Sequence, residues 1–390
     1  MNIAQTRDTG MSAELRLAIA GFTYPDLHKS ERLKELLDIF DAEVAAENPE
    51  LFSKWDAYRS NPSAPRTAVE VSALLVGMAR HVSKFVIRLF GVESEADALV
   101  AATASQDPVF RFKIDFVRRR VLPVVKKTAK PADPSALESQ LQILRSIACD
   151  ETADLERSTS VAGAKLLDAE RAFGDKGCEE DRERFDSFVH QLRDALGESA
   201  AAKDARQVIG VWAETLTQWC VLHLHDPAYR HWVSFRFPEA VEHFNLVKVQ
   251  KPLNDLPEAM IGPDDRLRRR DGFALTDRRM SDREVLSEIH YCILCHERDK
   301  DTCSKGIRGA DGKITINPLD IPLAGCPLDE KISEMHFLRK EGDAVGALAL
   351  VMISNPMCPG TGHRICNDCM KACIYQKQDP VNIPQIETGV

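Results

Sequence analysis

Eight of the eleven cysteines of this 390-residue chain lie in its last hundred residues. They form one Cys-x-x-Cys pair, one single cysteine, two cysteines followed by proline, and a closely spaced run of three. In chain order they are Cys292, Cys295, Cys303, Cys326, Cys358, Cys366, Cys369 and Cys373. Thiolates are soft ligands that favour zinc, copper and iron-sulfur clusters. Since two four-cysteine centres require eight such ligands, the pattern predicts metal or cluster binding.

Iron-sulfur clusters are the favoured interpretation, and zinc is the alternative. A Cys-x-x-Cys turn points two thiolates at one centre while backbone amides donate to the sulfurs. A proline directly after a cysteine, as at Cys326 and Cys358, is also found in iron-sulfur proteins. Structural zinc sites usually hold two Cys-x-x-Cys pairs about 12 to 20 residues apart. Here the pairs 292/295 and 366/369 are about 70 residues apart.

Other candidate residues give weaker signals. The cysteines at positions 149, 178 and 220 stand alone, and an isolated cysteine is most often a small buried hydrophobe. His296 and His363 neighbour the cysteine motifs, where hydrogen bonding to a ligand is a more common role than ligation. The glycines at 360 and 362 lack the rest of a dinucleotide fingerprint. We therefore predict no catalytic residue and no nucleotide site in this chain.

Composition indicates a globular protein of the cytoplasm. Hydrophobic residues make up 44% and charged residues 28%, and the net charge of -9 argues against nucleic acid as a partner. The N-terminus lacks the features of a secretory signal. The longest apolar runs are about half of the ~18 residues that a membrane helix needs. In a reducing compartment the cysteines are not expected to form disulfides.

The elements that must position the cysteines are helices. From residue 23 to about 280 apolar residues recur at three- and four-residue spacing, as in Leu33 to Val44 and Val71 to Leu89, the latter ending at Gly91. We expect an all-α protein with a helical domain over 1–280, a possible sub-boundary near 129–135, and a helical ferredoxin-like domain over 281–390.

A capping box opens the second of these domains. Ser281 and Glu284 have the spacing of such a box, and the helix that follows runs through Val285 and Ile289. This places Cys292 and Cys295 at or just beyond the C-terminal end of that helix.

The segment from Cys292 to Glu387 resembles the N-terminal iron-sulfur domain shared by the small subunit of bacterial glutamate synthase and dihydropyrimidine dehydrogenase. The features that carry the resemblance are Cys292-x-x-Cys295, Cys326-Pro327, Thr361-Gly-His-Arg-Ile-Cys366-x-x-Cys369-x-x-x-Cys373 and Pro380-Val-Asn-Ile-Pro-Gln-Ile-Glu387. They cover about a quarter of the chain.

The resemblance implies two 4Fe-4S clusters. One cluster would be held by Cys292, Cys295, Cys303 and Cys373, and the other by Cys326, Cys366 and Cys369. Its fourth ligand is left open between Cys358, which is the softer ligand, and Glu387, which stands at the position the family uses.

The resemblance also implies a role in electron transfer. The chain stops where the family continues into a domain that binds FAD and NAD(P)H, so these cofactors are expected on a flavoprotein partner or a missing domain. We expect an electron-transfer module of a flavin- and NAD(P)H-linked oxidoreductase. The alternative is a structural or assembly module, stabilised by zinc or by clusters, that carries no electrons.

Overall fold

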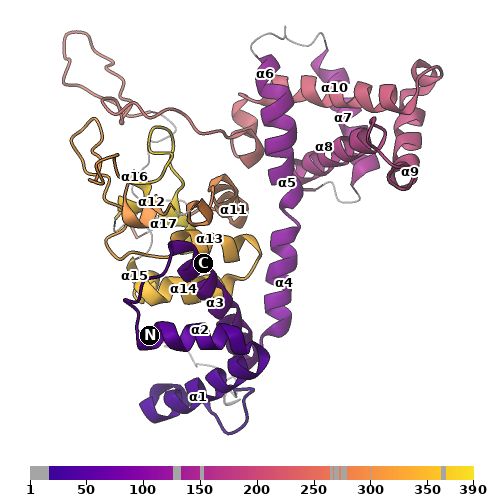
Figure 1. The fold of residues 1–390 in the computed structure, drawn as a ribbon. Helices are drawn as coiled ribbons and strands as arrows, with labels where there is room; N and C mark the ends of the chain where they lie inside the picture. The colour runs from indigo at the N-terminus through magenta and orange to yellow at the C-terminus, as the bar shows by residue number, and fades with distance from the viewer. Residues whose placement is uncertain are drawn as a thin grey trace, which may run out of the picture. The chain divides into compact units, whose positions relative to one another are not determined.

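A computed structural model describes residues 17–125, 133–149, 153–263, 267, 272–273, 279–298, 300–361 and 366–390. These residues are mostly helical, and they contain no strand beyond isolated bridges such as Gln250 with Ile261. The all-α expectation is therefore confirmed for the described residues (Figure 1). None of the described helices is both long and apolar enough to cross a bilayer.

The chain folds into two compact units, whose described residues lie within 17–102, 241–279 and 291–390 for the first and within 103–240 and 280–290 for the second. This grouping cuts across a boundary at 280, because the N-terminal helices pack with the C-terminal segment. Of the proposed sub-boundary near 129–135, residues 129–132 lie outside the described residues, and helix α7 begins at Pro134.

The first unit is built around helix α3. Its helices are η1 (Tyr24–His28), α1 (Ser30–Glu47), α2 (Pro49–Ser60), α3 (Ala68–Phe90), η7 (Cys295–Arg298), α12 (Thr302–Lys305), α13 (Ile332–Lys340), α14 (Ala344–Ser354), α15 (Cys358–Thr361), α16 (Asp368–Lys371) and α17 (Ile383–Gly389). Helix α4 (Glu93–Ala104) runs from this unit into the second.

The sequence of helix α3 provides a capping signal at each end and apolar residues for packing. Thr67 and Glu70 make a capping box at its N-terminus, and Gly91 ends it in the left-handed conformation with φ +62°. One face packs on α1 and α2 through Leu74 and Met78. Another packs along α14, which lies beside it in Figure 1.

Polar contacts reinforce the packing of α3 against the C-terminal segment. The hydroxyl of Ser83 donates to Asp343 at 2.6 Å, and Asp343 also caps α14 by accepting from the backbone N–H of Gly346 at 2.8 Å. Arg80 pairs with Glu341 at 2.6 Å. The helices α1 to α3 and the cysteine-rich region thus belong to one folded unit.

The second unit is a helical bundle with its own core. Its helices are α5 (Asp107–Arg111), η2 (Phe112–Val121), α6 (Leu122–Val125), α7 (Pro134–Ala148), α8 (Leu155–Ala172), α9 (Glu179–Leu196), η3 (Gly197–Ala200), α10 (Ala205–His223), η4 (Pro227–Tyr229), η5 (Val233–Phe235) and α11 (Asp282–Tyr291). Segment η2 is π-helical. Gly163 of α8 allows close packing, because a Cβ there would lie 2.4 Å from the ring of Phe112.

The helices expected from periodicity are present. The patterns through Leu33 and Val71 lie in α1 and α3, and the capping box of Ser281 and Glu284 starts α11 as expected, with Ser281 N–H donating to Glu284 at 2.9 Å. Helix α8 was not predicted. Its inward face is made mainly of small residues, Ser, Thr, Ala and Gly, so the apolar periodicity on which the prediction relied is weak there.

Candidate thiol centres

The first Cys-x-x-Cys pair lies in a tight turn after α11. Cys292 follows the last residue of that helix, and Leu294 takes φ +52°, which reverses the chain before η7 begins at Cys295. The backbone N–H of Leu294 donates to the Cys292 sulfur at 3.4 Å. Such amide donors stabilise negative charge on a ligand sulfur.

The long loop between Cys303 and Cys326 folds back on itself, so its length does not separate the two cysteines. Ile307 N–H donates to Leu323 at 2.9 Å, and Thr315 N–H donates to Ile307 at 2.8 Å. The backbone N–H of Cys326 donates to the carbonyl of Cys303 at 2.8 Å.

The two backbones at the neck of this loop touch at glycines. A Cβ at Gly325, where φ is +85°, would lie 2.5 Å from the backbone nitrogen of Gly306. A Cβ at Gly306, where φ is +82°, would lie 2.7 Å from the carbonyl oxygen of Leu323. Only glycine allows this approach, so the two glycines bring Cys303 and Cys326 together.

The C-terminal cysteines come from short helices. Cys369 is buried in α16, which packs against α12, the helix of Cys303. Cys373 is buried just beyond α16, Cys366 is exposed before it, and Cys358 is buried at the start of α15.

We call Cys292, Cys295, Cys303 and Cys373 the first thiol group, because the other thiols of this set raise the pKa of Cys292 or Cys303. The pKa of Cys292 is raised to about 12, mainly by burial; the thiols of Cys295 and Cys373 contribute to the rise, and the backbone N–H of Leu294 opposes it. Burial also raises the pKa of Cys303 well above its usual range, and Asp301 and the other three thiols of the group add to this effect. Cys292 and Cys303 are thus neutral thiols until a cation stabilises the thiolates.

By the same criterion we call Cys326, Cys366 and Cys369 the second thiol group. Burial raises the pKa of Cys326, Cys366 adds to the rise, and the backbone N–H groups of Leu328 and Glu330 oppose it by donating to the sulfur. The pKa of Cys369 is raised by burial first, and then by Glu387, Cys326 and Cys366.

Cys358 and Glu387, the two candidates for a fourth position, lie near each other. The pKa of Cys358 is raised to about 11, mainly by burial, with smaller contributions from Glu387 and Glu330. The pKa of Glu387 is itself raised to about 8, because it is buried and its carboxyl hydrogen-bonds to Glu330. Sequence reasoning missed Glu330, which follows Cys326 in a turn and has no motif signal of its own.

The two histidines near the cysteine motifs and the isolated cysteines are not part of either thiol group. His296 is buried beside the first thiol group, and its Nδ1 has no hydrogen-bond partner among the described residues. His363 lies outside the described residues. Cys220 is fully buried in the core of the second unit, as expected, whereas Cys178 is exposed and caps α9 by accepting from Asp181 N–H at 3.4 Å.

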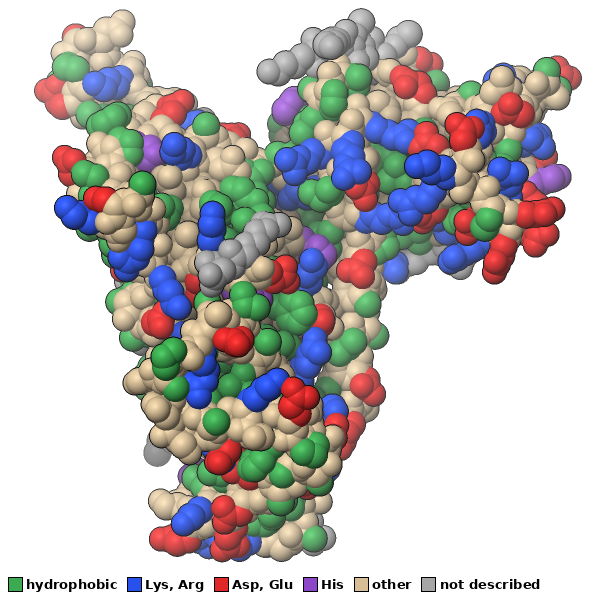
Figure 2. Space-filling view, in the orientation of Figure 1, with side chains coloured by type: hydrophobic (Ala, Val, Ile, Leu, Met, Phe, Trp, Pro, Cys, Tyr) green, Lys and Arg blue, Asp and Glu red, His purple; other side chains and the backbone are tan. Residues whose placement is uncertain are grey.

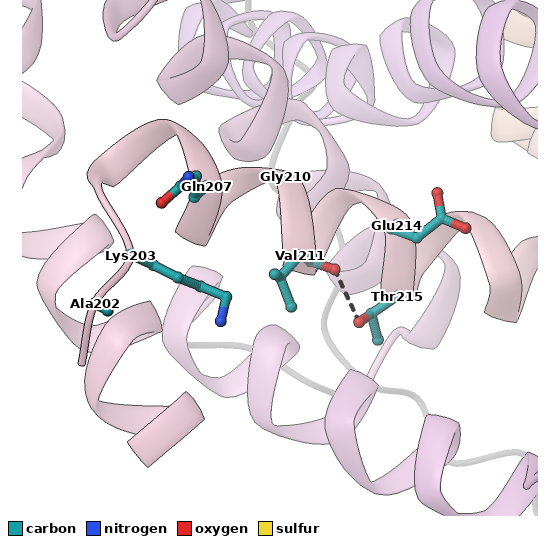
Figure 3. Close-up of a pocket in the computed structure, with 7 residues that line it drawn as sticks. All are labelled: Ala202, Lys203, Gln207, Gly210, Val211, Glu214 and Thr215. Atoms are coloured by element: carbon teal, nitrogen blue, oxygen red, sulfur yellow. Dashed lines mark hydrogen bonds between the residues drawn. The ribbon is translucent and has the colours of Figure 1, made fainter. Parts of the chain in front are cut away.

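One hollow on the described surface belongs to the second unit, and no cysteine lines it. A shallow depression on α10 is lined by Lys203, Gln207, Glu214 and Thr215, and Thr215 donates back to the carbonyl of Val211 at 3.0 Å (Figure 3). Basic and acidic side chains are interspersed on the face shown in Figure 2. The thiol groups are therefore the candidate site.

Comparison with known proteins finds one family model and two curated relatives, each matching only part of this chain. Residues 17–91 match the family described as the RP005 N-terminal alpha-helical domain. The chain is 76% identical over 34 residues to the uncharacterized protein RP006 of Rickettsia prowazekii, which is 9% of this chain and 5% of that protein. It is 45% identical over 67 residues to the uncharacterized protein RP005 of the same organism, 15% of this chain and 22% of that protein. No solved structure matches.

These findings correct the identification made from the cysteine motifs. The resemblance to the glutamate synthase small subunit and to dihydropyrimidine dehydrogenase is wrong as a family assignment, because the matches are to RP005 and RP006. The description of this chain as a metal-binding, 4Fe-4S, electron-transfer oxidoreductase of that family is overturned for the same reason. Among the described residues no three His, Cys, Asp or Glu side chains are grouped closely enough to hold a metal ion. Short cysteine motifs fit several families, which is why they misled the assignment.

Proposed function

We propose that residues 291–390 bind two clusters of soft metal through the two thiol groups, with 4Fe-4S clusters as the cofactor, and that this centre relays electrons. The proposal does not rest on the corrected family assignment. It rests on one observation: seven cysteines from segments up to about 80 residues apart in sequence gather into two groups of neighbouring thiols.

The residues present suit such a cofactor. Backbone N–H groups donate to the sulfurs of Cys292 and Cys326, as is common around cluster ligands. Cys295, Cys303 and Cys369 are buried, which would keep water from the ligands. A cluster of four irons also keeps its ligands further apart than one ion does, so the proposal does not require three side chains to converge on a point.

The protein residues would hold the clusters and shield them from water. The cysteines of each group would lose their protons as they bind, because a cation favours the thiolate over the buried neutral thiol. The clusters would supply one-electron transfer. Only the corrected resemblance implied a flavoprotein partner with FAD and NAD(P)H. The proposal therefore names no electron donor or acceptor.

The proposal is tested by anaerobic reconstitution with ferrous iron and sulfide. We expect a brown protein with broad absorption near ~400 nm, about eight irons per chain, and an electron paramagnetic resonance signal after reduction with dithionite. Cys295→Ser and Cys369→Ser should each lose about half of the iron, since each removes a ligand of one group. Cys178→Ser is the matched control, since Cys178 is exposed in the other unit, and it should keep all of it.

A colourless protein that retains stoichiometric zinc would contradict the proposal and support the structural module instead. Bound iron that dithionite does not reduce would equally favour a cluster-stabilised assembly module without electron transfer.

A further inference from the structure

The first unit carries an exposed segment that is rich in apolar side chains. Residues 244–261, which we call the arm, contain no helix, and all of them except Ala259 are exposed. Figure 1 shows the arm as an extended loop. Its exposed large apolar residues are Phe244, Leu246, Val247, Val249, Leu253, Leu256, Met260 and Ile261. Exposed apolar residues gathered in this way mark an interaction surface.

The backbone of the arm is also largely unpaired. Its two limbs, 244–251 and 252–261, are joined by one antiparallel bridge, in which Gln250 and Ile261 exchange hydrogen bonds of 2.7 and 2.9 Å. The N–H groups of residues 246–249 donate to no described residue. A two-stranded ribbon is marginally stable in water, and its open edges can pair with another chain. The arm therefore has the properties of an edge strand without a neighbour.

The apolar surface of the arm is large enough for a dimer interface. Phe244 is 84% exposed and Val247 is 71% exposed, and the other six residues range from 41% to 61%. At ~150 to 200 Å² for a fully exposed residue of this size, the arm offers on the order of 800 Å². A standard protein interface buries ~800 Å² on each partner. Two arms thus supply the apolar area that one such interface requires.

The charges of the arm are divided between its limbs. The first limb carries Lys248 and Lys251, and the second carries Asp255 and Glu258. None of these four side chains forms an ion pair with a described residue. A two-fold axis between two copies sets the first limb of each against the second limb of the other, so that lysines face carboxylates in both halves. The arm is therefore complementary to a second copy of itself.

We propose that the arm is a dimerisation element: the arms of two copies of this chain pack on each other, first limb against second limb, through their apolar side chains and their opposite charges. The inference is independent of what the thiol groups bind. It is tested on the full, metal-free chain in reducing buffer, where no disulfide can join two copies.

The first experiment measures the mass of the protein by sedimentation equilibrium over a range of concentrations, and we expect a dimer. Phe244→Ser combined with Val247→Ser should raise the dissociation constant by about a hundredfold, because it removes the two most exposed apolar side chains. Leu33→Ser combined with Leu37→Ser is the matched control. These residues of α1 are 46% and 47% exposed in the same unit, and their replacement should leave the dimer unchanged.

Two outcomes of this experiment overturn the inference. One is a wild-type chain that stays monomeric at about 0.1 mM, the result expected if a different protein or this chain's own surface covers the arm. The other is a dimer that the arm variant leaves unchanged, since its interface would then lie elsewhere.

The second experiment tests which limbs meet. Lys248→Glu combined with Lys251→Glu makes both limbs negative, and Asp255→Lys combined with Glu258→Lys makes both positive. Each variant alone should dimerise about tenfold more weakly than wild type, because like charges then face each other. An equimolar mixture should form a mixed dimer with an affinity close to that of wild type, measured with a fluorescent label on one variant. A mixture that dimerises as weakly as its components overturns the pairing of first limb with second limb.

Discussion

The backbone N–H of Cys326 donates to the carbonyl oxygen of Cys303 at 2.8 Å, which joins the two thiol groups by a single main-chain hydrogen bond. The bond depends on the close approach of Gly306 and Gly325, two residues with positive φ at the neck of the intervening loop. The relative position of the groups is thus determined by backbone geometry, and their separation along the chain has little bearing on it.

Gly325→Ala should destabilise the first unit. The new Cβ would meet backbone atoms of Gly306 and Ser304 at 2.5 and 2.7 Å, and neither can move as a side chain would. We expect the free energy of unfolding to fall by about 3 kcal/mol, combining the left-handed conformation and the clash. Chemical denaturation measures the change.

The control for this variant is Gly312→Ala. Gly312 also has positive φ, +76°, but a Cβ there would meet nothing within 4 Å. It should cost only about 1 kcal/mol. Equal losses for the two variants would show that the contact between the backbones contributes nothing.

Asp343→Ala should weaken the packing of α14 on α3. Asp343 accepts from Gly346 N–H as the cap of α14 and from the hydroxyl of Ser83 in α3. We expect a loss of about 2 kcal/mol in unfolding free energy from the lost cap and the unpaired hydroxyl, and thermal denaturation measures it.

The control is Arg80→Ala, which removes an ion pair between half-exposed side chains on the same interface. It should change the free energy of unfolding by less than about 0.5 kcal/mol. A larger loss for Arg80→Ala than for Asp343→Ala would refute this ranking.

Arg283→Met should destabilise the second unit. The guanidinium of Arg283 contacts Glu156 at 3.1 Å, Asp154 at 3.2 Å and Gln106 at 2.7 Å, and Glu156 is only 4% exposed. Removing the arginine leaves the buried Glu156 carboxylate with its hydrogen bonds from Ser234 but without its cationic partner, which costs about 3 kcal/mol. Arg206→Met, which breaks an exposed pair with Asp175, is the control and should have little effect.

The loss in Arg283→Met should also depend on pH. Burial tends to raise the pKa of Asp154, but hydrogen bonds from Arg283 and from the backbone of Arg157 outweigh it, and the pKa is lowered from 3.8. A lowered carboxyl pKa stabilises the fold above the unfolded-state value, and this stabilisation is lost as pH falls through the folded-state value. The difference in stability between wild type and variant should therefore narrow below about pH 4, and a constant difference down to pH 2 would contradict the assignment.

Glu387 gives the opposite pH dependence in the metal-free chain. Burial and the hydrogen bond to Glu330 raise its pKa from 4.5 to about 8, so the folded state binds a proton that the unfolded state releases. The stability from this group is complete below pH 4.5 and is lost as pH rises toward 8. Glu387→Gln keeps a hydrogen-bonding side chain and should flatten this part of the stability curve. Denaturation midpoints measured across that range test the expectation, and an unchanged slope in the variant would rule it out.

Local patterns predicted much of the secondary structure. Two helix-end signals each involve only a few neighbouring residues, so the sequence predicts them without tertiary information. They are the capping box of Ser281 and Glu284 and the C-terminal cap at Gly91. Helix α8 was missed because its buried positions are small and polar residues such as Ser160, whose hydroxyl bonds back to Glu156. The family assignment was wrong because a few cysteines at common spacings do not identify a family.

The sequence by itself determined that eight thiols, a side-chain type that binds soft metals, lie within the last hundred residues. Only the tertiary structure decided how those thiols are grouped, that Glu330 joins Glu387 beside them, and that α3 packs with α14 across more than 250 residues. Contacts of this range depend on loop geometry and packing, such as the approach of Gly306 to Gly325, which local periodicity does not encode.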